Sequence, residues 1–168
     1  MSYEQHIHSA ESIIARCAVI TLSDTRTEST DTSGARIKEL LIEQSHVVAH
    51  YQILPDDPKQ LDALLKTLTA RSDIDVILTN GGTGISQRDQ TIDAIEKHVS
   101  RPLPGFGELF RMLSYQQIGS GAMLSRAVGG IAGDKILFAV PGSTKAVELA
   151  MTKLILPEIK HLLRELRK

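Results

Sequence analysis

The chain has 168 residues and a mass of 18.4 kDa, which is the usual size of one globular domain. Its 42% apolar and 23% charged residues are ordinary for a folded protein, and 19 basic against 20 acidic side chains lack the basic excess of a nucleic-acid-binding surface. The single cysteine, Cys17, excludes an internal disulfide and a zinc site built from several cysteines.

The hydropathy pattern also argues against membrane association. No apolar run approaches the ~20 residues that cross a bilayer, and residues 1–11 lack the basic and apolar regions of a secretion signal. We therefore expect a cytoplasmic protein with no membrane and no nucleic-acid partner. Residues 1–14 are predicted to be an N-terminal extension, and residues 15–168 a single domain.

Predicted strands and helices alternate along the chain. Short apolar, β-branched runs predict strands at 17–22, 47–54, 75–79 and 135–140. Apolar residues three and four positions apart predict helices at 33–41, 61–68, 91–99, 104–115, 145–156 and 157–168. This alternation predicts an α/β fold, with one domain of three α/β/α layers around a mostly parallel sheet.

Polar loops follow four of the predicted strands, at 23–31, 55–58, 80–84 and 141–144. The carboxyl ends of parallel strands meet at one edge of a sheet, where such folds bind their ligands. The sequence therefore predicts a ligand pocket formed by these loops.

The glycine-rich loop Asn80-Gly81-Gly82-Thr83-Gly84 is the strongest local motif. Its glycines allow backbone conformations that direct N–H groups toward an anion such as a phosphate. The loop is neither a Walker A motif nor a Gly-x-Gly-x-x-Gly dinucleotide fingerprint. A simple tight turn explains the same residues, so both interpretations stay open at this point.

Carboxylates flank this loop in the sequence. Asp89 lies just before a predicted helix, and Asp56 and Asp57 lie between two prolines. Helix capping or turn formation explains each one alone. At the same sheet edge as a phosphate site, however, they would repel the substrate unless a cation such as Mg²⁺ bridged them.

Three further motifs are weaker. Gly105-Phe106-Gly107-Glu108 is either a helix start or a place for a flat ligand to approach closely. Ser125-Arg126 offers a hydroxyl and a cation. Pro141-Gly142-Ser143 offers a helix N-terminus, although simple capping explains it too. The histidines show no metal-ligand spacing and no Ser-His-Asp arrangement.

Five motifs together resemble the MoaB/Mog molybdopterin-binding family, and most closely its MoaB branch. The resemblance covers nearly the whole chain from about Ala18 onward. It is carried by Asn80–Gly84, Arg88-Asp89-x-Thr91, Gly105–Arg111, Ser125-Arg126 and Pro141–Ser143.

The resemblance implies a three-layer α/β fold, assembly as trimers or hexamers, and adenylylation of molybdopterin with ATP and Mg²⁺. It implies catalytic and metal-binding roles for Asp56 and Asp89, and other proteins of molybdenum cofactor biosynthesis as partners. The resemblance also implies molybdopterin or nucleotide binding by the following residues: Asn80, Gly81, Gly82, Thr83, Gly84, Gly105, Phe106, Gly107, Glu108, Ser125, Arg126, Pro141, Gly142 and Ser143.

The expected chemistry suits these residue types. A phosphate monoester of the pterin would attack the α-phosphorus of ATP and expel pyrophosphate, and with a second pKa of about 6 it is already mostly ionised at pH 7. Catalysis then requires alignment and charge neutralisation but no strong base. Two alternatives stay open: a non-catalytic molybdopterin carrier, and an oligomeric scaffold with a vestigial pocket.

Overall fold

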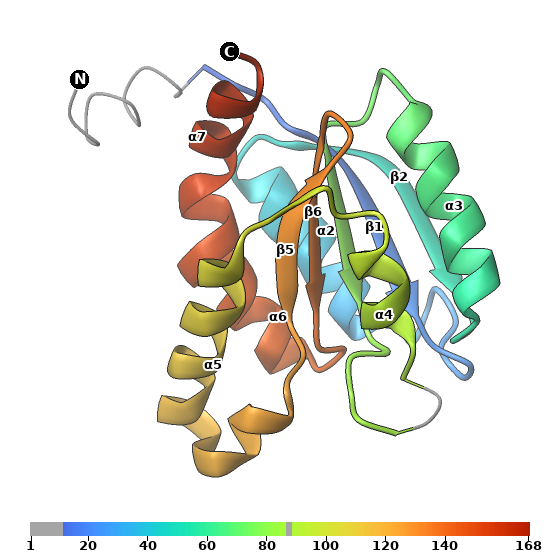
Figure 1. The fold of residues 1–168 in the computed structure, drawn as a ribbon, viewed down its shortest axis with the longest axis vertical. Helices are drawn as coiled ribbons and strands as arrows, with labels where there is room; N and C mark the ends of the chain where they lie inside the picture. Colours follow the sequence, from blue (N-terminus) through green and yellow to red (C-terminus); the bar gives the residue numbers. More distant parts are fainter. Residues whose placement is uncertain (1–11, 87–88) are drawn as a thin grey trace.

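The computed structural model describes residues 12–86 and 89–168, so most of the predicted extension at 1–14 lies outside it. Its centre is one six-stranded sheet with strand order β2-β1-β3-β6-β5-β4 (Figure 1). The strands are β1 (Arg16–Leu22), β2 (Val47–Leu54), β3 (Val76–Asn80), β4 (Arg101–Pro102), β5 (Val128–Ala132) and β6 (Lys135–Val140).

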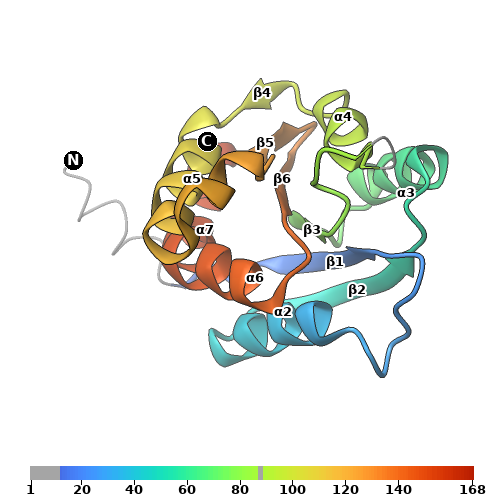
Figure 2. The same cartoon turned by 90° about the horizontal axis from the view of Figure 1, so that it is seen from below.

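Helices cover both faces of the sheet, which confirms the predicted three-layer architecture (Figures 1 and 2). One face carries α2 (Thr32–Glu43), α5 (Pro104–Ile118), α6 (Thr144–Ala150) and α7 (Leu156–Leu166). The other face carries α3 (Pro58–Ala70) and α4 (Thr91–Glu96). Two hydrophobic cores result, one on each side of the sheet.

The sheet is mostly parallel, as predicted. Strands β2, β1, β3 and β6 run parallel to one another, whereas β5 pairs antiparallel with both β6 and β4. The sequence did not predict β5 or β4. Two glycines in β5 weaken its strand pattern, yet close packing requires them: a Cβ at Gly129 would lie 2.8 Å from Cδ1 of Phe138.

The C-terminal helices differ from the prediction at their junction. Instead of two separate helices meeting at residues 156 and 157, a π-helical turn over Met151–Ile155 joins α6 directly to α7. Pro157 follows this turn and cannot donate the backbone N–H of a regular α-helix. Helix α4 is also shorter than predicted and ends at Glu96.

The sole cysteine lies inside the molecule. Cys17 is on the interior strand β1 and has no exposed surface. Burial raises the pKa of its thiol to about 12, so the reactive thiolate is scarce at neutral pH. Inert packing is therefore the correct interpretation of this residue.

Among residues 12–86 and 89–168, no helix combines the length and the apolar character needed to cross a membrane.

An ion cluster ties the C-terminus to the sheet at the end opposite the predicted pocket. The carboxylate of Asp75 accepts hydrogen bonds from Arg16 Nε at 2.8 Å, Arg16 Nη2 at 2.7 Å and Arg167 Nη2 at 2.9 Å. Burial disfavours the ionised carboxylate, but these hydrogen bonds outweigh it and lower the pKa of Asp75 to about 2. The cluster should therefore stabilise the fold only while Asp75 is ionised.

We expect Asp75→Asn to lower the free energy of unfolding at pH 7 by about 2–3 kcal/mol, from the difference between a folded pKa near 2 and an unfolded pKa of ~3.9. Because the folded pKa is the lower one, this stabilisation is present above about pH 4 and disappears as the pH falls toward 2. Urea unfolding of both proteins at pH 7 and pH 2 tests this. Glu43→Gln, on the exposed face of α2, should change stability little at either pH.

Candidate active site

The loops that follow β1, β2, β3 and β6 gather at one edge of the sheet, as predicted (Figure 1). A cavity of about 490 Å³ opens there. Its lining combines the glycine-rich loop, Asp89 and the loop after β6 with residues of α5 and of the 3₁₀ helix Gly119–Leu124. The predicted site residues in this lining are Gly81, Gly82, Thr83, Gly84, Asp89, Ser125, Pro141, Gly142 and Ser143.

The glycine-rich loop depends on its glycines. Gly81 and Gly82 have φ angles of 96° and 62°, a left-handed conformation that side chains disfavour. A Cβ at Gly81 would strike the carbonyl oxygen of Leu22, and one at Gly142 would lie 3.1 Å from Cα of Gly81. The loops after β3 and β6 are therefore in direct contact.

Asn80 lies beneath this loop rather than on the cavity wall. Its side chain has no exposed surface, accepts a hydrogen bond from the Ser33 hydroxyl at 2.9 Å, and donates to Thr21 Oγ1 at 2.9 Å. These contacts anchor the start of the loop. A direct ligand contact by Asn80 stays a prediction.

Asp56 and Asp89 lie next to glycines of this loop. A Cβ at Gly82 would lie 2.8 Å from Oδ1 of Asp56, and one at Gly84 would lie 2.6 Å from Oδ2 of Asp89. The structure thus brings both predicted carboxylates to the same loop. Asp57 faces elsewhere, because its carboxylate caps α3 by accepting the N–H groups of Lys59 and Gln60.

The two carboxylates differ in their surroundings. Burial, followed by the negative charges of Asp24 and Asp89, raises the pKa of Asp56. Its Oδ1 atom is buried and has no hydrogen-bond partner among the described residues, while its backbone N–H donates to Oδ1 of Asp24 at 3.0 Å. Hydrogen bonding from Ser86, including its N–H at 2.9 Å, lowers the pKa of Asp89.

This environment suits a bound cation. An unpaired buried carboxylate oxygen surrounded by negative charge is costly, and a hard divalent cation binds oxygen ligands of this kind. Within the described residues no three Asp, Glu, His or Cys side chains form a ready metal cluster. Asp56 and Asp89 would therefore share the ion with substrate phosphates and water, which is how Mg²⁺ is often bound.

The remaining predicted residues lie in or near a second, larger cavity of about 760 Å³. Gly107, Glu108, Ser125 and Arg126 line it, and Ser125 belongs to both cavities. Phe106 is buried against Phe138, with ring centroids 4.7 Å apart, and Gly105 is exposed on the first turn of α5. Ligand contacts at Gly105 and Phe106 stay predictions.

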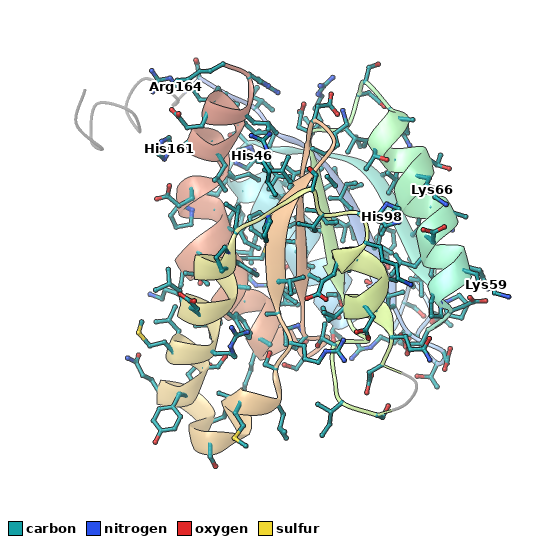
Figure 3. The ribbon with its side chains drawn as sticks, viewed as in Figure 1. His46, Lys59, Lys66, His98, His161 and Arg164 are labelled. Carbon is teal, nitrogen blue, oxygen red and sulfur yellow. The ribbon has the colours of Figure 1, made fainter. Side chains whose placement is uncertain are left out.

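The described histidines have other partners. His98 lies 2.8 Å from Oδ1 of Asp62, and Nδ1 of His46 accepts the N–H of Ala15. Figure 3 shows His46 and His161 toward the end of the molecule opposite the candidate site. None of these three lines either cavity.

Sequence reasoning missed several residues of the smaller cavity. Arg26, Phe110 and Ser114 line it. No motif distinguishes Arg26 or Ser114 from ordinary loop or helix residues, and Phe110, within the Gly105–Arg111 motif, has a side chain that equally suits packing against the core. Thr91 lies beside the loop and not on the cavity wall. It does carry a signal, because it ends the Arg-Asp-x-Thr motif, and a Cβ at Gly82 would clash with its hydroxyl. Arg88 of the same motif lies outside the described residues.

Comparison with known proteins identifies the family. Residues 18–161 match the family model described as "Probable molybdopterin binding domain". The chain belongs to this molybdopterin-binding domain family. It is 50% identical over 169 residues to molybdenum cofactor biosynthesis protein B of Halalkalibacterium halodurans, across 100% of this chain and 99% of that protein.

Solved structures of family members agree with the fold. A crystal structure of molybdenum cofactor biosynthesis protein B matches with a TM-score of 0.90 and 51% identity, covering 92% of this chain and 97% of that one. The molybdopterin biosynthesis enzyme MoaB of Thermus thermophilus matches with a TM-score of 0.80 and 33% identity, covering 91% and 96%.

Proposed function

We propose that this chain acts in molybdenum cofactor biosynthesis by binding molybdopterin and adenylylating it with Mg-ATP, releasing pyrophosphate. The relatives' names place those proteins in this pathway. The observation that carries the proposal is the position of Asp56 and Asp89 beside the glycine-rich loop, with one buried oxygen of Asp56 unpaired within residues 12–86 and 89–168.

The residues of the site would act mainly by alignment. Backbone N–H groups of the loop would orient the phosphates, and Asp56 and Asp89 would hold the cation. When bound, Mg²⁺ supplies positive charge that offsets the charge on the attacking and leaving phosphates. The terminal phosphate of molybdopterin forms a P–O bond to the α-phosphorus as the bond to pyrophosphate breaks.

Purified protein incubated anaerobically with molybdopterin and Mg-ATP tests this function. We expect adenylylated molybdopterin and pyrophosphate to form in equal amounts. Saturable molybdopterin binding without product would instead support the carrier alternative. Absence of both binding and product would support the scaffold alternative.

We also propose that the chain assembles as a trimer or hexamer. Exposed apolar side chains cluster on α5 and the following 3₁₀ helix: Leu109, Met112, Tyr115, Ile118, Met123 and Leu124. An exposed apolar patch of this kind is typical of a protein interface. In the assembled protein, neighbouring copies of the chain would cover this surface.

Met112→Glu is expected to shift the protein toward smaller species, because a charge buried in an apolar interface is unfavourable. Met112 is 51% exposed and lines neither cavity. Light scattering coupled to size-exclusion chromatography would measure the mass. Ala63→Glu introduces the same charge at an exposed position of α3, on the other face of the sheet, and should leave the mass unchanged; equal masses for all three proteins would contradict this interface.

A further inference from the structure

A buried carboxylate lies close to the candidate site but outside both cavities. Asp31 ends the loop that follows β1 and caps α2, and only 2% of its surface is exposed. It lines neither cavity, and no step of the proposed reaction uses it. Burying an ionised carboxylate is unfavourable unless hydrogen bonds compensate for the lost water. The groups that provide this compensation therefore indicate the role of the charge.

Hydrogen-bond donors surround the carboxylate of Asp31. Its Oδ2 atom accepts hydrogen bonds from the Thr21 hydroxyl at 2.6 Å and the Tyr51 hydroxyl at 2.8 Å. Its Oδ1 atom accepts the N–H of Gly34 at 2.9 Å and the hydroxyl of Ser33 at 3.1 Å. Burial disfavours the ionised form, but these hydrogen bonds outweigh it and lower the pKa of Asp31. Asp31 is therefore ionised at neutral pH, and its side chain only accepts hydrogen bonds.

The charge of Asp31 fixes the orientation of the Asn80 side chain. Because an ionised carboxylate has no hydrogen to give, the Thr21 hydroxyl must direct its own hydrogen to Asp31. The Thr21 oxygen is then left to accept a hydrogen bond from Nδ2 of Asn80 at 2.9 Å. Nδ2 also donates to the carbonyl oxygen of Ile20 at 3.3 Å. The Asn80 carbonyl oxygen consequently faces the Ser33 hydroxyl at 2.9 Å, whose hydrogen it shares with Asp31.

Asn80 in turn fixes the start of the glycine-rich loop. It is the last residue of β3, pairs with Thr21 of β1 in the sheet, and immediately precedes Gly81, whose φ is 96°. A Cβ at Gly81 would strike the carbonyl oxygen of Leu22. The Gly81 N–H donates to the carbonyl oxygen of Val140 at 3.1 Å. Because the loop starts between the ends of β1 and β6 with no spare room, a change in the orientation of the Asn80 side chain is expected to displace it.

We propose that Asp31 is a positioning residue of the candidate active site, acting through Thr21 and Asn80 on the glycine-rich loop. Its effect on catalysis rests on the proposed function, whereas its effect on the loop does not. Asp31 touches no reacting atom. Its charge holds in place the backbone N–H groups that would align the phosphates, and a misplacement of about 1 Å in an aligning group is enough to slow a reaction 10²-fold.

Two substitutions break this connection at different points. Asp31→Asn keeps the size of the side chain but brings an amide that can donate to Thr21, so the Thr21 hydroxyl loses its fixed direction. Thr21→Val keeps the shape and removes the hydroxyl, while the cap of α2 stays intact. For each variant we expect kcat for adenylyl transfer to fall at least about tenfold, the range seen when groups that orient a site are removed. The double variant should be no slower than the slower single variant, because both changes break one chain of contacts.

Tyr51→Phe is the matched control. It also removes one hydrogen bond from Oδ2 of Asp31, but the Tyr51 hydroxyl is not part of the chain that leads to Asn80. This variant should keep kcat within about twofold of the wild type. Thr21→Ser, which retains the hydroxyl, should restore most of the rate that is lost in Thr21→Val. A loss of rate in Tyr51→Phe equal to that in Asp31→Asn would overturn the proposal, because the rate would then follow the stability of the buried cluster.

Amide hydrogen exchange tests the positioning without any ligand. The Gly81 N–H donates to the carbonyl oxygen of Val140, so its exchange rate reports how often the start of the loop leaves its native position. The Ile136 N–H is an internal reference, because it donates to the carbonyl oxygen of Asp75 at 3.1 Å at the opposite end of the sheet. Dividing the Gly81 rate by the Ile136 rate removes any general loss of stability.

We expect this ratio, measured by NMR on the ligand-free protein, to rise at least about tenfold in Asp31→Asn and Thr21→Val and to stay within about twofold in Tyr51→Phe. An unchanged ratio in the first two variants would overturn the proposal, whatever their activity. A raised ratio in a chain whose wild type forms no adenylylated molybdopterin would support the positioning and contradict only the proposed function.

Discussion

Replacing Asp89 by asparagine is expected to lower the rate of adenylyl transfer about 10²–10³-fold, the range seen when one electrostatic contact to a reacting group is removed. Asparagine has nearly the same volume and retains an oxygen that can accept the Ser86 N–H, now at 2.9 Å. The free energy of unfolding should therefore change by less than about 1 kcal/mol. Pyrophosphate release under single-turnover conditions and urea unfolding measure the two effects.

Asp57→Asn is the matched control for this prediction. Asp57 lies next to Asp56 but caps α3, and asparagine is an equally good N-cap. This variant should retain both turnover and stability. An Asp89→Asn protein that turns over at the wild-type rate would rule out a cation-binding role for the carboxylate.

Gly82→Ala is expected to abolish most of the activity and to cost about 1–2 kcal/mol of stability. The stability cost arises from the φ angle of 62°, which side chains disfavour. The activity loss arises because the new methyl group would lie 2.8 Å from Oδ1 of Asp56 and would clash with the Thr91 hydroxyl. The loop and the carboxylate would have to move apart.

Gly133→Ala separates these two effects. Gly133 has a nearly identical φ angle of 64°, but a Cβ there would meet nothing within 4 Å. We therefore expect a similar backbone cost with unchanged turnover. Equal losses of turnover in Gly82→Ala and Gly133→Ala would show that activity follows overall stability and not the geometry of the loop. For both variants, thermal unfolding measures the stability cost and initial rates measure turnover.

The parts of the fold that were predictable are those with periodic apolar patterns. Strands β1, β3 and β6 are almost entirely buried, so each one is a short, mostly apolar run in the sequence. Strand β5 contains Gly129 and Gly130, whose lack of side chains is a packing requirement set by Phe138 and Val99. Such a requirement depends on distant residues, so local patterns could not reveal it.

The site was predictable where topology alone brings residues together. Parallel strands place their carboxyl ends at one edge of the sheet, so the Asp56 and Gly82 loops had to lie at the same edge, although β1 separates β2 from β3. Sequence could not decide that Asp57 caps α3 whereas Asp56 faces Gly82. Nor could it show that Ser125 stands between two cavities, because that depends on how α5 and the 3₁₀ helix pack.

Because Cys17 is buried, the rate at which its thiol is modified reports how often the folded protein opens. A maleimide or disulfide reagent can modify it only after β1 separates from its neighbours, because the folded thiol is enclosed and rarely ionised. The labelling rate in native buffer thus counts opening events, with no second cysteine to confuse the signal. Ligands that stabilise the folded state should slow the labelling of Cys17 in proportion to their occupancy.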